Sequence, residues 1–276
     1  MSEIQAETRA FLFAHPAKHS LSPVMHNAAL EVMGIAARYK ARDVKPENLR
    51  EALEDLRGSS IWGVNLSIPH KQMALEMVDS ISVEARAIGA INTVVHRDGK
   101  LHGLNTDAPG FMRSLEDAGV NVRGCDVVVL GAGGAARGVC WALKQAGAKV
   151  AFWTRTPERA RELTEEFDLE AFVTDDLLSK AIAGSSGLVN TTSVGLENPD
   201  ESPIAGDLFP RDWVCDIVYR PLETKLLRNA REHGIRTVDG LGMLVHQGAL
   251  ALEAWTGRDV SAEIMRRAAL EALGEV

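Results

Sequence analysis

The stretch CDVVVLGAGGAARGVCWALKQAGAKVAFWTR, residues Cys125–Arg155, decides the fold. Its apolar run Val127–Leu130 predicts a buried strand, and the amphipathic segment after the glycines predicts a helix that Gly147 ends. A second apolar run leads to Trp153. This order of strand, glycine turn, helix and strand is typical of the first βαβ unit of a dinucleotide-binding domain.

The glycine turn fits the fingerprint G-x-G-x-x-(G/A) with Gly131, Gly133 and Ala136. The first glycine suits a tight turn, and the second lets backbone N–H groups approach a pyrophosphate at the start of the helix. We therefore expect cofactor contacts at Gly131, Ala132, Gly133, Gly134 and Ala135. The alternative is a tight strand-to-helix turn that binds no ligand.

Arginine stands after the second strand, where a carboxylate usually accepts hydrogen bonds from an adenosine ribose. A carboxylate would repel a 2′-phosphate there, whereas the planar guanidinium of Arg155 suits one. Thr156 is expected to cap the next helix, which puts Arg159 in its first turn. A cation there opposes the helix dipole, so its presence suggests a bound anion nearby. The pattern therefore favours NADP(H) over NAD(H), with contacts at Thr154, Arg155, Thr156 and Arg159. A solvated surface charge is the alternative for Arg155.

Short apolar runs alternate with amphipathic stretches along the rest of the chain, which predicts an α/β fold with largely parallel sheets. We expect a helix capped by Ser22, a hairpin that turns at Asp98-Gly99, and a strand near residues 172–174. Two helices are expected to close the chain.

A boundary near residue 107 divides the predicted elements into two domains. An N-terminal α/β substrate domain would comprise residues 1–107, completed by C-terminal helices in 239–276. A Rossmann-type NADP-binding domain would comprise residues 108–238.

The composition limits the classes of function. The 276-residue chain carries a net charge of −8, so we expect no nucleic-acid partner. Its three cysteines show neither disulfide nor metal-ligand spacing, which indicates a reducing compartment and no metal site. No segment reaches the roughly 18 apolar residues that span a bilayer, and the N-terminus lacks a signal-peptide pattern. We expect a cytoplasmic protein with no membrane partner.

Polar side chains gather near predicted turns of the first 107 residues, at Ser20, Ser22, Asn65, Ser67, Lys71, Asn92, Asn105 and Asp107. Taken singly, each has a structural explanation. Ser22 can be a helix cap, Lys71 a surface charge, and Asp107 the cap of the following helix.

Taken together, the motifs resemble the shikimate dehydrogenase family. The ordered set is HSLSP, NLSIPHK, GAINTV, NTD, GAGGAARG, TRTPER, NTTSVG, DIVY and DGLGML…Q, and it runs from about His15 to Gln247. That family reduces 3-dehydroshikimate to shikimate with NADPH in aromatic amino-acid (chorismate) biosynthesis. The resemblance implies the same activity here, with NADP(H) as cofactor and shikimate or 3-dehydroshikimate as the small-molecule partner.

The resemblance also implies a role for each matching position. Lys71 corresponds to the family's catalytic acid/base, and Asp107 corresponds to its partner. Substrate contacts are implied at Ser20, Ser22, Asn65, Ser67, Asn92, Tyr219 and Gln247. Cofactor contacts are added at Ile217 and Gly240, and the active site would lie in a cleft between the domains. Ser67 stands where threonine is usual in the family, and Thr154 stands where asparagine is usual.

Two alternatives stay open. A quinate/shikimate dehydrogenase of broader substrate and cofactor use would share nearly every motif, but it should favour an acidic side chain near position 155. A non-catalytic sensor on the same fold would have no need of an acid/base pair such as Lys71 and Asp107. The oligomeric state is also open, with a homodimer as one expectation.

Overall fold

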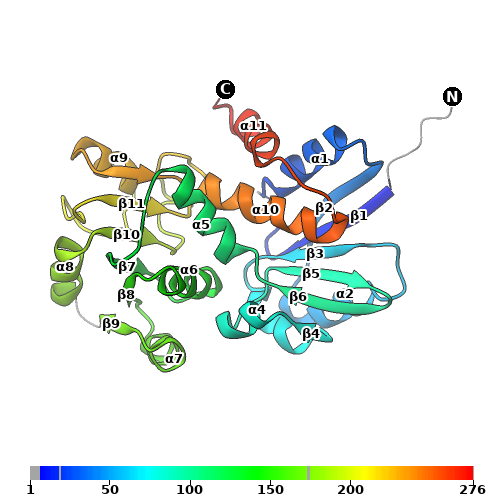
Figure 1. The fold of residues 1–276 in the computed structure, drawn as a ribbon, viewed down its shortest axis with the longest axis horizontal. Helices are drawn as coiled ribbons and strands as arrows, with labels where there is room; N and C mark the ends of the chain where they lie inside the picture. The colour runs from blue at the N-terminus through cyan, green and yellow to red at the C-terminus, as the bar shows by residue number, and fades with distance from the viewer. Residues whose placement is uncertain (1–6, 19, 173–174, 276) are drawn as a thin grey trace. The chain divides into compact units, whose positions relative to one another are not determined.

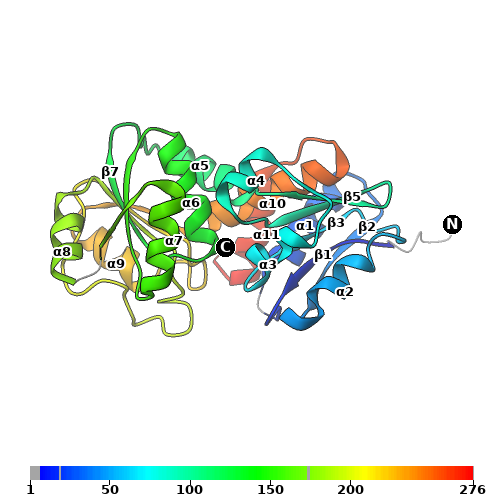
Figure 2. The same ribbon diagram turned by 90° about the horizontal axis from the view of Figure 1, so that it is seen from below.

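The computed structural model describes residues 7–18, 20–172 and 175–275, which Figures 1 and 2 draw as a ribbon. The chain separates into two compact units: unit 1 is Met1–Gly110 with Val245–Val276, and unit 2 is Phe111–Leu244. The division falls within two helices, α5 (Asp107–Asp117) and α10 (Gly240–Thr256). The predicted domain ranges divide the chain a few residues earlier and stay a prediction.

Unit 1 is built on a six-stranded mixed sheet. Its strands are β1 (Glu7–Ala14), β2 (Ala37–Asp43), β3 (Gly63–Leu66), β4 (Ser80–Ile81), β5 (Thr93–Arg97) and β6 (Lys100–Leu104), in the order β2-β1-β3-β5-β6-β4. Its helices besides parts of α5 and α10 are α1 (Ser22–Val32), η1 (Pro46–Asn48), α2 (Leu49–Glu54), α3 (His70–Met73), η2 (Ala74–Glu76), α4 (Val83–Ile88) and α11 (Ala262–Leu273). β1 pairs in parallel with β2 and β3, whereas β5 and β6 form the predicted antiparallel hairpin. At its turn Asp98 and Gly99 have φ values of 51° and 74°, the left-handed conformation that such a two-residue turn requires.

The two faces of this sheet bury different side chains. Phe13 and Val64 pack with Leu49 and Leu53 of α2 in an apolar cluster. Tyr39 is paired with Ala10 in the parallel register, so it points to the face opposite Phe13. That face includes α1 and is where the site described below lies.

Unit 2 is built on a six-stranded sheet in which every pair is parallel. Its strands are β7 (Asp126–Leu130), β8 (Lys149–Trp153), β9 (Glu170–Phe172), β10 (Gly187–Asn190), β11 (Trp213–Asp216) and β12 (Arg236–Val238), in the order β12-β11-β10-β7-β8-β9. Its helices besides parts of α5 and α10 are α6 (Gly134–Gln145), α7 (Pro157–Phe167), α8 (Asp175–Gly184) and α9 (Lys225–Glu232). Figure 2 shows α6 and α7 on one side of this sheet and α8 and α9 on the other. The strand order reverses between β7 and β10, which is where a doubly wound sheet binds its ligand.

The α/β fold class and the Rossmann-type βαβ unit are confirmed, because β7, the glycine turn, α6 and β8 follow one another as the sequence predicts. One cap prediction is wrong. Ser22 is the first residue of α1 rather than its cap, and its N–H donates to the hydroxyl of Ser20 at 3.2 Å. The hydroxyl that satisfies this helix entrance therefore comes from two residues earlier. Of the predicted strand near residues 172–174, Val173 and Thr174 lie outside the described residues, as does His19 of the HSLSP motif.

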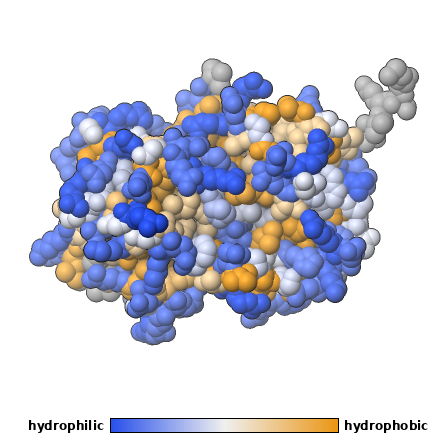
Figure 3. All heavy atoms as spheres, viewed as in Figure 1, coloured by the Kyte–Doolittle hydropathy of each residue, from blue (hydrophilic) through white to orange (hydrophobic). Residues whose placement is uncertain are grey.

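None of the described helices combines the length and the apolarity needed to cross a membrane. Figure 3 shows one face of the molecule, on which apolar residues are scattered among hydrophilic ones.

Candidate active site

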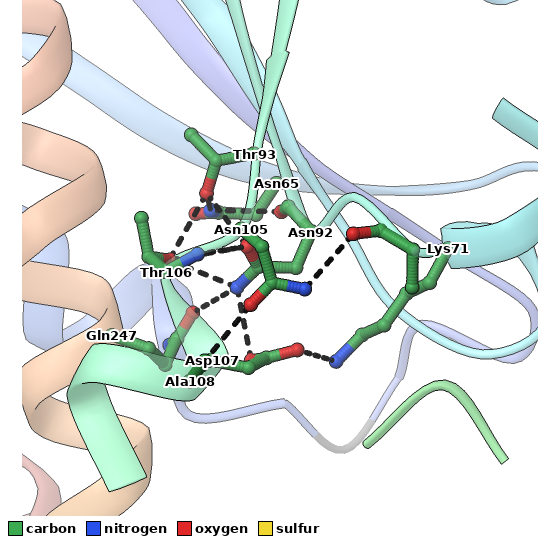
Figure 4. Close-up of polar contacts among 10 residues, drawn as sticks. Asn65, Lys71, Asn92, Thr93, Asn105, Thr106, Asp107, Ala108 and Gln247 are labelled. Carbon is green, nitrogen blue, oxygen red and sulfur yellow. Dashed lines mark hydrogen bonds and ion pairs between the residues drawn. The ribbon is translucent and has the colours of Figure 1, made fainter. Parts of the chain in front are cut away.

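Lys71 and Asp107 meet at one end of the unit 1 sheet, although 36 positions separate them in the sequence (Figure 4). Nζ of Lys71, in α3, donates to Oδ2 of Asp107, the first residue of α5, at 2.6 Å. The side chain of Lys71 is 17% exposed and that of Asp107 is 5% exposed. The carboxylate is thus enclosed by protein, while the lysine side chain keeps part of its surface in contact with solvent.

The other oxygen of Asp107 is held by Asn92, whose side chain is buried. Nδ2 of Asn92 lies 2.9 Å from Oδ1 of Asp107, 2.9 Å from Oγ1 of Thr106 and 3.2 Å from Oε1 of Gln247. Its Oδ1 accepts from the backbone N–H of Thr106 at 2.7 Å. Asn92 therefore fixes the orientation of the carboxylate and joins β5, α5 and α10 within unit 1.

Asn65 lies beside this network, and protein groups use most of its hydrogen-bonding capacity. Its Nδ2 donates to the carbonyl of Asn92 at 3.3 Å and to Oγ1 of Thr93 at 3.0 Å. Its Oδ1 accepts from the hydroxyl of Tyr39 at 2.9 Å. Both amide hydrogens of Asn65 are thus used by protein groups, which limits the substrate contact expected of it to its second oxygen lone pair.

Three serine hydroxyls of the expected substrate site differ in their contacts. The hydroxyl of Ser20 accepts from the N–H of Ser22 at the entrance of α1, and Ser22 itself is buried near the Tyr39 hydroxyl. The half-buried Ser67 follows β3, and its hydroxyl has no partner among the residues that the structure describes. Ser67 is therefore the hydroxyl best able to accept or donate a new hydrogen bond.

Gln247 and Tyr219, the last two residues expected to contact the substrate, belong to different units. Gln247 lies in α10 within unit 1, where the backbone of Gly110 approaches it so closely that a Cβ on the glycine would lie 2.7 Å from its nitrogen. Tyr219 follows β11 in unit 2 and is half-buried. Its contact with the substrate stays a prediction.

Three buried side chains of this network were not predicted from the sequence: Tyr39, Thr93 and Thr106. Thr106 lies between Asn105 and Asp107 in the motif NTD, and Thr93 follows Asn92 in NTV. Being next to predicted site residues is the sequence signal that could have identified these two threonines. No local signal pointed to Tyr39, because the strand that brings it to Asn65 is distant in sequence.

The glycine turn of unit 2 has the geometry of a phosphate site. Gly131 has φ of +114°, and a Cβ on it would lie 2.6 Å from Oγ1 of Thr191, so this position requires glycine for both conformation and space. Gly133 has φ of −84° and ψ of −175°, which any residue can adopt, and a Cβ there would meet nothing within 4 Å. Nothing in the described protein explains glycine at position 133. Space for a ligand over the first N–H groups of α6 does explain it, so the turn fits a dinucleotide pyrophosphate.

The arginine turn after β8 is open to solvent. Arg155 and Arg159 are exposed, and neither forms a hydrogen bond or an ion pair with another described residue. Thr156 stands at the N-cap position of α7, as predicted, but its side chain makes no capping bond. Instead its N–H donates to the hydroxyl of Thr154 at 3.3 Å, which shapes the turn. Two guanidinium groups without a described protein partner at this place fit the expected 2′-phosphate.

Ile217 and Gly240 lie at the same carboxyl edge of the sheet. A Cβ on Gly240 would lie 2.3 Å from the carbonyl oxygen of Ile217, so glycine here lets two chain segments approach. This contact within the protein is enough to explain glycine at position 240, without the expected approach of the backbone to the cofactor. Cofactor contacts at both positions stay predictions.

Within the described residues, no three His, Cys, Asp or Glu side chains are grouped as ligands for a metal ion.

Comparison with known proteins shows the same family along the whole chain. The model of the shikimate dehydrogenase substrate binding domain matches residues 12–94, and that of the shikimate 5′-dehydrogenase C-terminal domain matches residues 240–270. A shikimate dehydrogenase (NADP(+)) of Thermus thermophilus is 46% identical over 267 residues, which are 96% of this chain and 99% of the relative.

Solved structures share the fold of the whole chain. A crystal structure of shikimate 5-dehydrogenase from Thermus thermophilus, in complex with NADP(H) and shikimate, is 45% identical with a TM-score of 0.90, covering 96% of this chain and 100% of that one. A 5-ketofructose reductase of Gluconobacter sp. is 32% identical with a TM-score of 0.84, covering 98% and 100%. The fold thus occurs with more than one ketone substrate.

Proposed function

Because this chain belongs to the shikimate dehydrogenase family, we propose that it catalyses the reversible, NADPH-dependent reduction of 3-dehydroshikimate to shikimate. The observation that carries the proposal is the contact of 2.6 Å between Nζ of Lys71 and Oδ2 of Asp107, at a place where the lysine reaches solvent. A relative with the same fold binds NADP(H) and shikimate together.

Reduction of a ketone needs a hydride on carbon and a proton on oxygen. Bound NADPH supplies the hydride. The ammonium of Lys71 stabilises the negative charge that develops on the carbonyl oxygen and donates the proton, which leaves a neutral amine and an alcohol. Solvent then returns a proton to the amine, since Lys71 is partly exposed. In the oxidative direction, the neutral amine of Lys71 takes the hydroxyl proton.

Asp107 orients Lys71 and contacts a substrate hydroxyl. Its Oδ1 is fixed by Nδ2 of Asn92 at 2.9 Å, so Oδ2 is held toward the lysine. A fixed carboxylate keeps the ammonium in position without reorganisation during the reaction.

The remaining substrate contacts are the ones that the family resemblance implies. The substrate carboxylate binds the hydroxyls of Ser20 and Ser22 at the entrance of α1, with Tyr219 assisting. The ring hydroxyls bind Ser67, whose hydroxyl has no other described partner, together with Asn65, Asn92 and Gln247. The tightly bonded amides of Asn65 and Asn92 give this part of the site a rigid wall.

NADP(H) would be held at the carboxyl edge of the unit 2 sheet. Residues 131–135 at the start of α6 would bind its pyrophosphate, and Arg155 and Arg159 would bind the 2′-phosphate with Thr154 and Thr156 in the same turn. Ile217 and Gly240 would contact the nicotinamide half.

A second candidate is the reduction of a different polyhydroxylated ketone, because a 5-ketofructose reductase has the same fold at 32% identity. That ketone lacks a carboxylate, so it would leave the hydroxyls of Ser20 and Ser22 without the anion we assign to them. A quinate/shikimate dehydrogenase would share nearly every motif of this chain, so quinate is included in the substrate panel below. A homodimer, the absence of nucleic acid and a cytoplasmic location stay predictions.

A substrate panel tests the proposal. Absorbance at 340 nm is followed with shikimate or quinate and NADP+ or NAD+, and with 5-ketofructose and NADPH. We expect shikimate with NADP+ to have the highest kcat/KM. A higher value for 5-ketofructose or quinate would replace the proposed substrate, and a higher value with NAD+ would replace the proposed cofactor.

A further inference from the structure

A buried carboxylate at the carboxyl edge of the unit 2 sheet joins three segments of chain. Asp216 ends β11 and has no exposed surface. Its Oδ1 accepts from Nδ2 of Asn190 at 2.9 Å and from the N–H of Val218 at 3.0 Å, and its Oδ2 accepts from the hydroxyl of Thr224 at 2.8 Å. Thr224 is the N-cap residue of α9. One side chain thus holds the loop after β10, the loop after β11 and the start of a helix.

Asn190 extends the network into the loop after β10. This fully buried amide accepts at Oδ1 from the N–H and the hydroxyl of Thr192, at 3.0 and 2.7 Å. Its Nδ2 lies 2.9 Å from Asp216 and 3.4 Å from the carbonyl oxygen of Val194. The side chain of Asn190 therefore holds the backbone of residues 192–194, and Asp216 holds the side chain of Asn190 in place.

The loop that is fixed in this way lies against the glycine turn. The N–H and hydroxyl of Thr191 both donate to the carbonyl of Leu130, at 2.9 and 2.6 Å, immediately before Gly131. β7 and β10 are the strands between which the sheet order reverses, which is where a doubly wound sheet binds its ligand. If the arginine turn after β8 holds the adenosine end of the cofactor, the nicotinamide end would extend to the other side of this point, toward the loops after β10 and β11.

A carboxylate in this position is costly to bury, and the three donors offset part of that cost. An apolar residue could end a buried strand without the same cost. The three donors instead tie together the end of β10, the loop after β11 and the start of α9 through one side chain. From this geometry we infer that Asp216 is a positioning residue, which holds the loops after β10 and β11 in the arrangement that binds the nicotinamide half of NADP(H). The inference rests on the proposed function for the identity of the cofactor.

The test compares a whole cofactor with its adenosine half. Binding of NADP+ and of adenosine 2′,5′-bisphosphate is measured by isothermal titration calorimetry on the full chain, for wild type, Asp216→Ala and Asp216→Asn. Asp216→Ala leaves three donors without an acceptor, whereas Asp216→Asn keeps Oδ1 for Asn190 and Val218. Ser185→Ala is the matched control, because it removes a buried hydroxyl that donates to Ile182 at 2.8 Å just before the opposite end of β10.

We expect Asp216→Ala to raise the Kd of NADP+ at least tenfold and that of adenosine 2′,5′-bisphosphate less than twofold. Asp216→Asn should recover the NADP+ Kd to within about threefold of wild type, and Ser185→Ala should change neither. If Asp216→Ala does not fold, as judged by circular dichroism, Asn190→Ala carries the same prediction. Equal weakening of both ligands, or no weakening, in the folded variant would overturn the inference alone. A wild-type chain that binds neither ligand would overturn the cofactor assignment and the inference with it.

Discussion

The side chains around Lys71 divide into those whose hydrogen-bonding capacity is used and those that keep some for a ligand. Both amide hydrogens of Asn65 are taken by protein acceptors, as are those of Asn92. The hydroxyl of Ser67 has no described partner, and Lys71 has one carboxylate partner and an open side. Amides with both hydrogens bonded, beside a lysine that one carboxylate holds, suit a site in which one proton must be delivered to one oxygen.

Replacing Lys71 by alanine should remove most of the turnover and keep the fold. Loss of the proton donor is expected to lower kcat by about 10²- to 10⁴-fold, with a smaller change in the KM for shikimate. The measurement is a steady-state assay of Lys71→Ala, with Lys100→Ala as the control because Lys100 is an exposed lysine of the same unit. A kcat within threefold of wild type for Lys71→Ala would remove this residue from the mechanism.

Replacing Arg155 by aspartate should change the choice of cofactor. The exposed guanidinium has no described protein partner, so its loss costs contacts only with a bound 2′-phosphate. We expect the ratio of kcat/KM for NADP+ to that for NAD+ to fall by about 10- to 100-fold or more. Arg161→Asp makes the same change of charge at an exposed position within α7 and should move the ratio less than threefold. Equal losses with both cofactors would mean that Arg155 is only a surface charge.

Asp216 should make the stability of the chain depend on pH. Burial raises the pKa of this carboxyl from 3.8 to about 6, although bonds from Val218, Thr224 and Asn190 lower it. Between these two values the folded chain holds the proton more strongly than the unfolded chain, so the unfolding free energy falls as pH rises. Relative to wild type, Asp216→Asn should gain about 2 kcal/mol in unfolding free energy between pH 4 and pH 7. Urea unfolding at several pH values measures this, and parallel curves for the two proteins would contradict it.

The turn between β7 and α6 uses two glycines for two different reasons. Gly131 needs glycine for the chain itself, because its φ is +114° and Thr191 occupies the place of a Cβ. The chain itself does not need glycine at position 133, because the backbone conformation is ordinary and the Cβ position is open, and we propose that this glycine serves the bound cofactor. Within this turn, Gly131 is thus assigned to folding and Gly133 to ligand binding.

Alanine at each glycine should show this separation. Gly131→Ala is expected to lower the unfolding free energy by about 1–3 kcal/mol through backbone strain and the clash with Thr191. Gly133→Ala should change it by less than about 0.5 kcal/mol and raise the Kd of NADP+ at least tenfold. Urea unfolding and calorimetric titration measure the two effects. A large loss of stability in Gly133→Ala would show that this glycine also serves the fold.

The sequence predicts the elements of unit 2 well because its strands are continuous apolar runs between clear helix signals, as at Val127–Leu130. It does not predict α3, η2, β4 and α4 between residues 68 and 88, since none of them is long enough to show a period. It also names the wrong serine at the entrance of α1, because Ser20 and Ser22 both fit a cap pattern. Of the site, local pattern predicts the glycine and arginine turns. The pairing of Lys71 with Asp107 follows only from the family resemblance, because no spacing rule relates residues on separate elements.

At the scale of the whole chain, the two sheets carry different parts of the machinery for the proposed reaction. The mixed sheet of unit 1 carries the acid/base pair and the hydroxyl-rich substrate groups, and the parallel sheet of unit 2 carries the phosphate-binding edge. The chain passes between the units within α5 and α10, and both helices carry residues of the site, Asp107 in one and Gln247 in the other. Neither unit alone holds both the proton donor and the cofactor turn.

The most direct measurement is the reduction of 3-dehydroshikimate by the purified full-length chain. NADPH is followed at 340 nm and the product is identified by chromatography against authentic shikimate. We predict one shikimate formed for each NADPH oxidised, with NADH at least tenfold less effective in kcat/KM. A chain that is folded and binds NADPH, yet forms no shikimate from 3-dehydroshikimate, would contradict the proposed function.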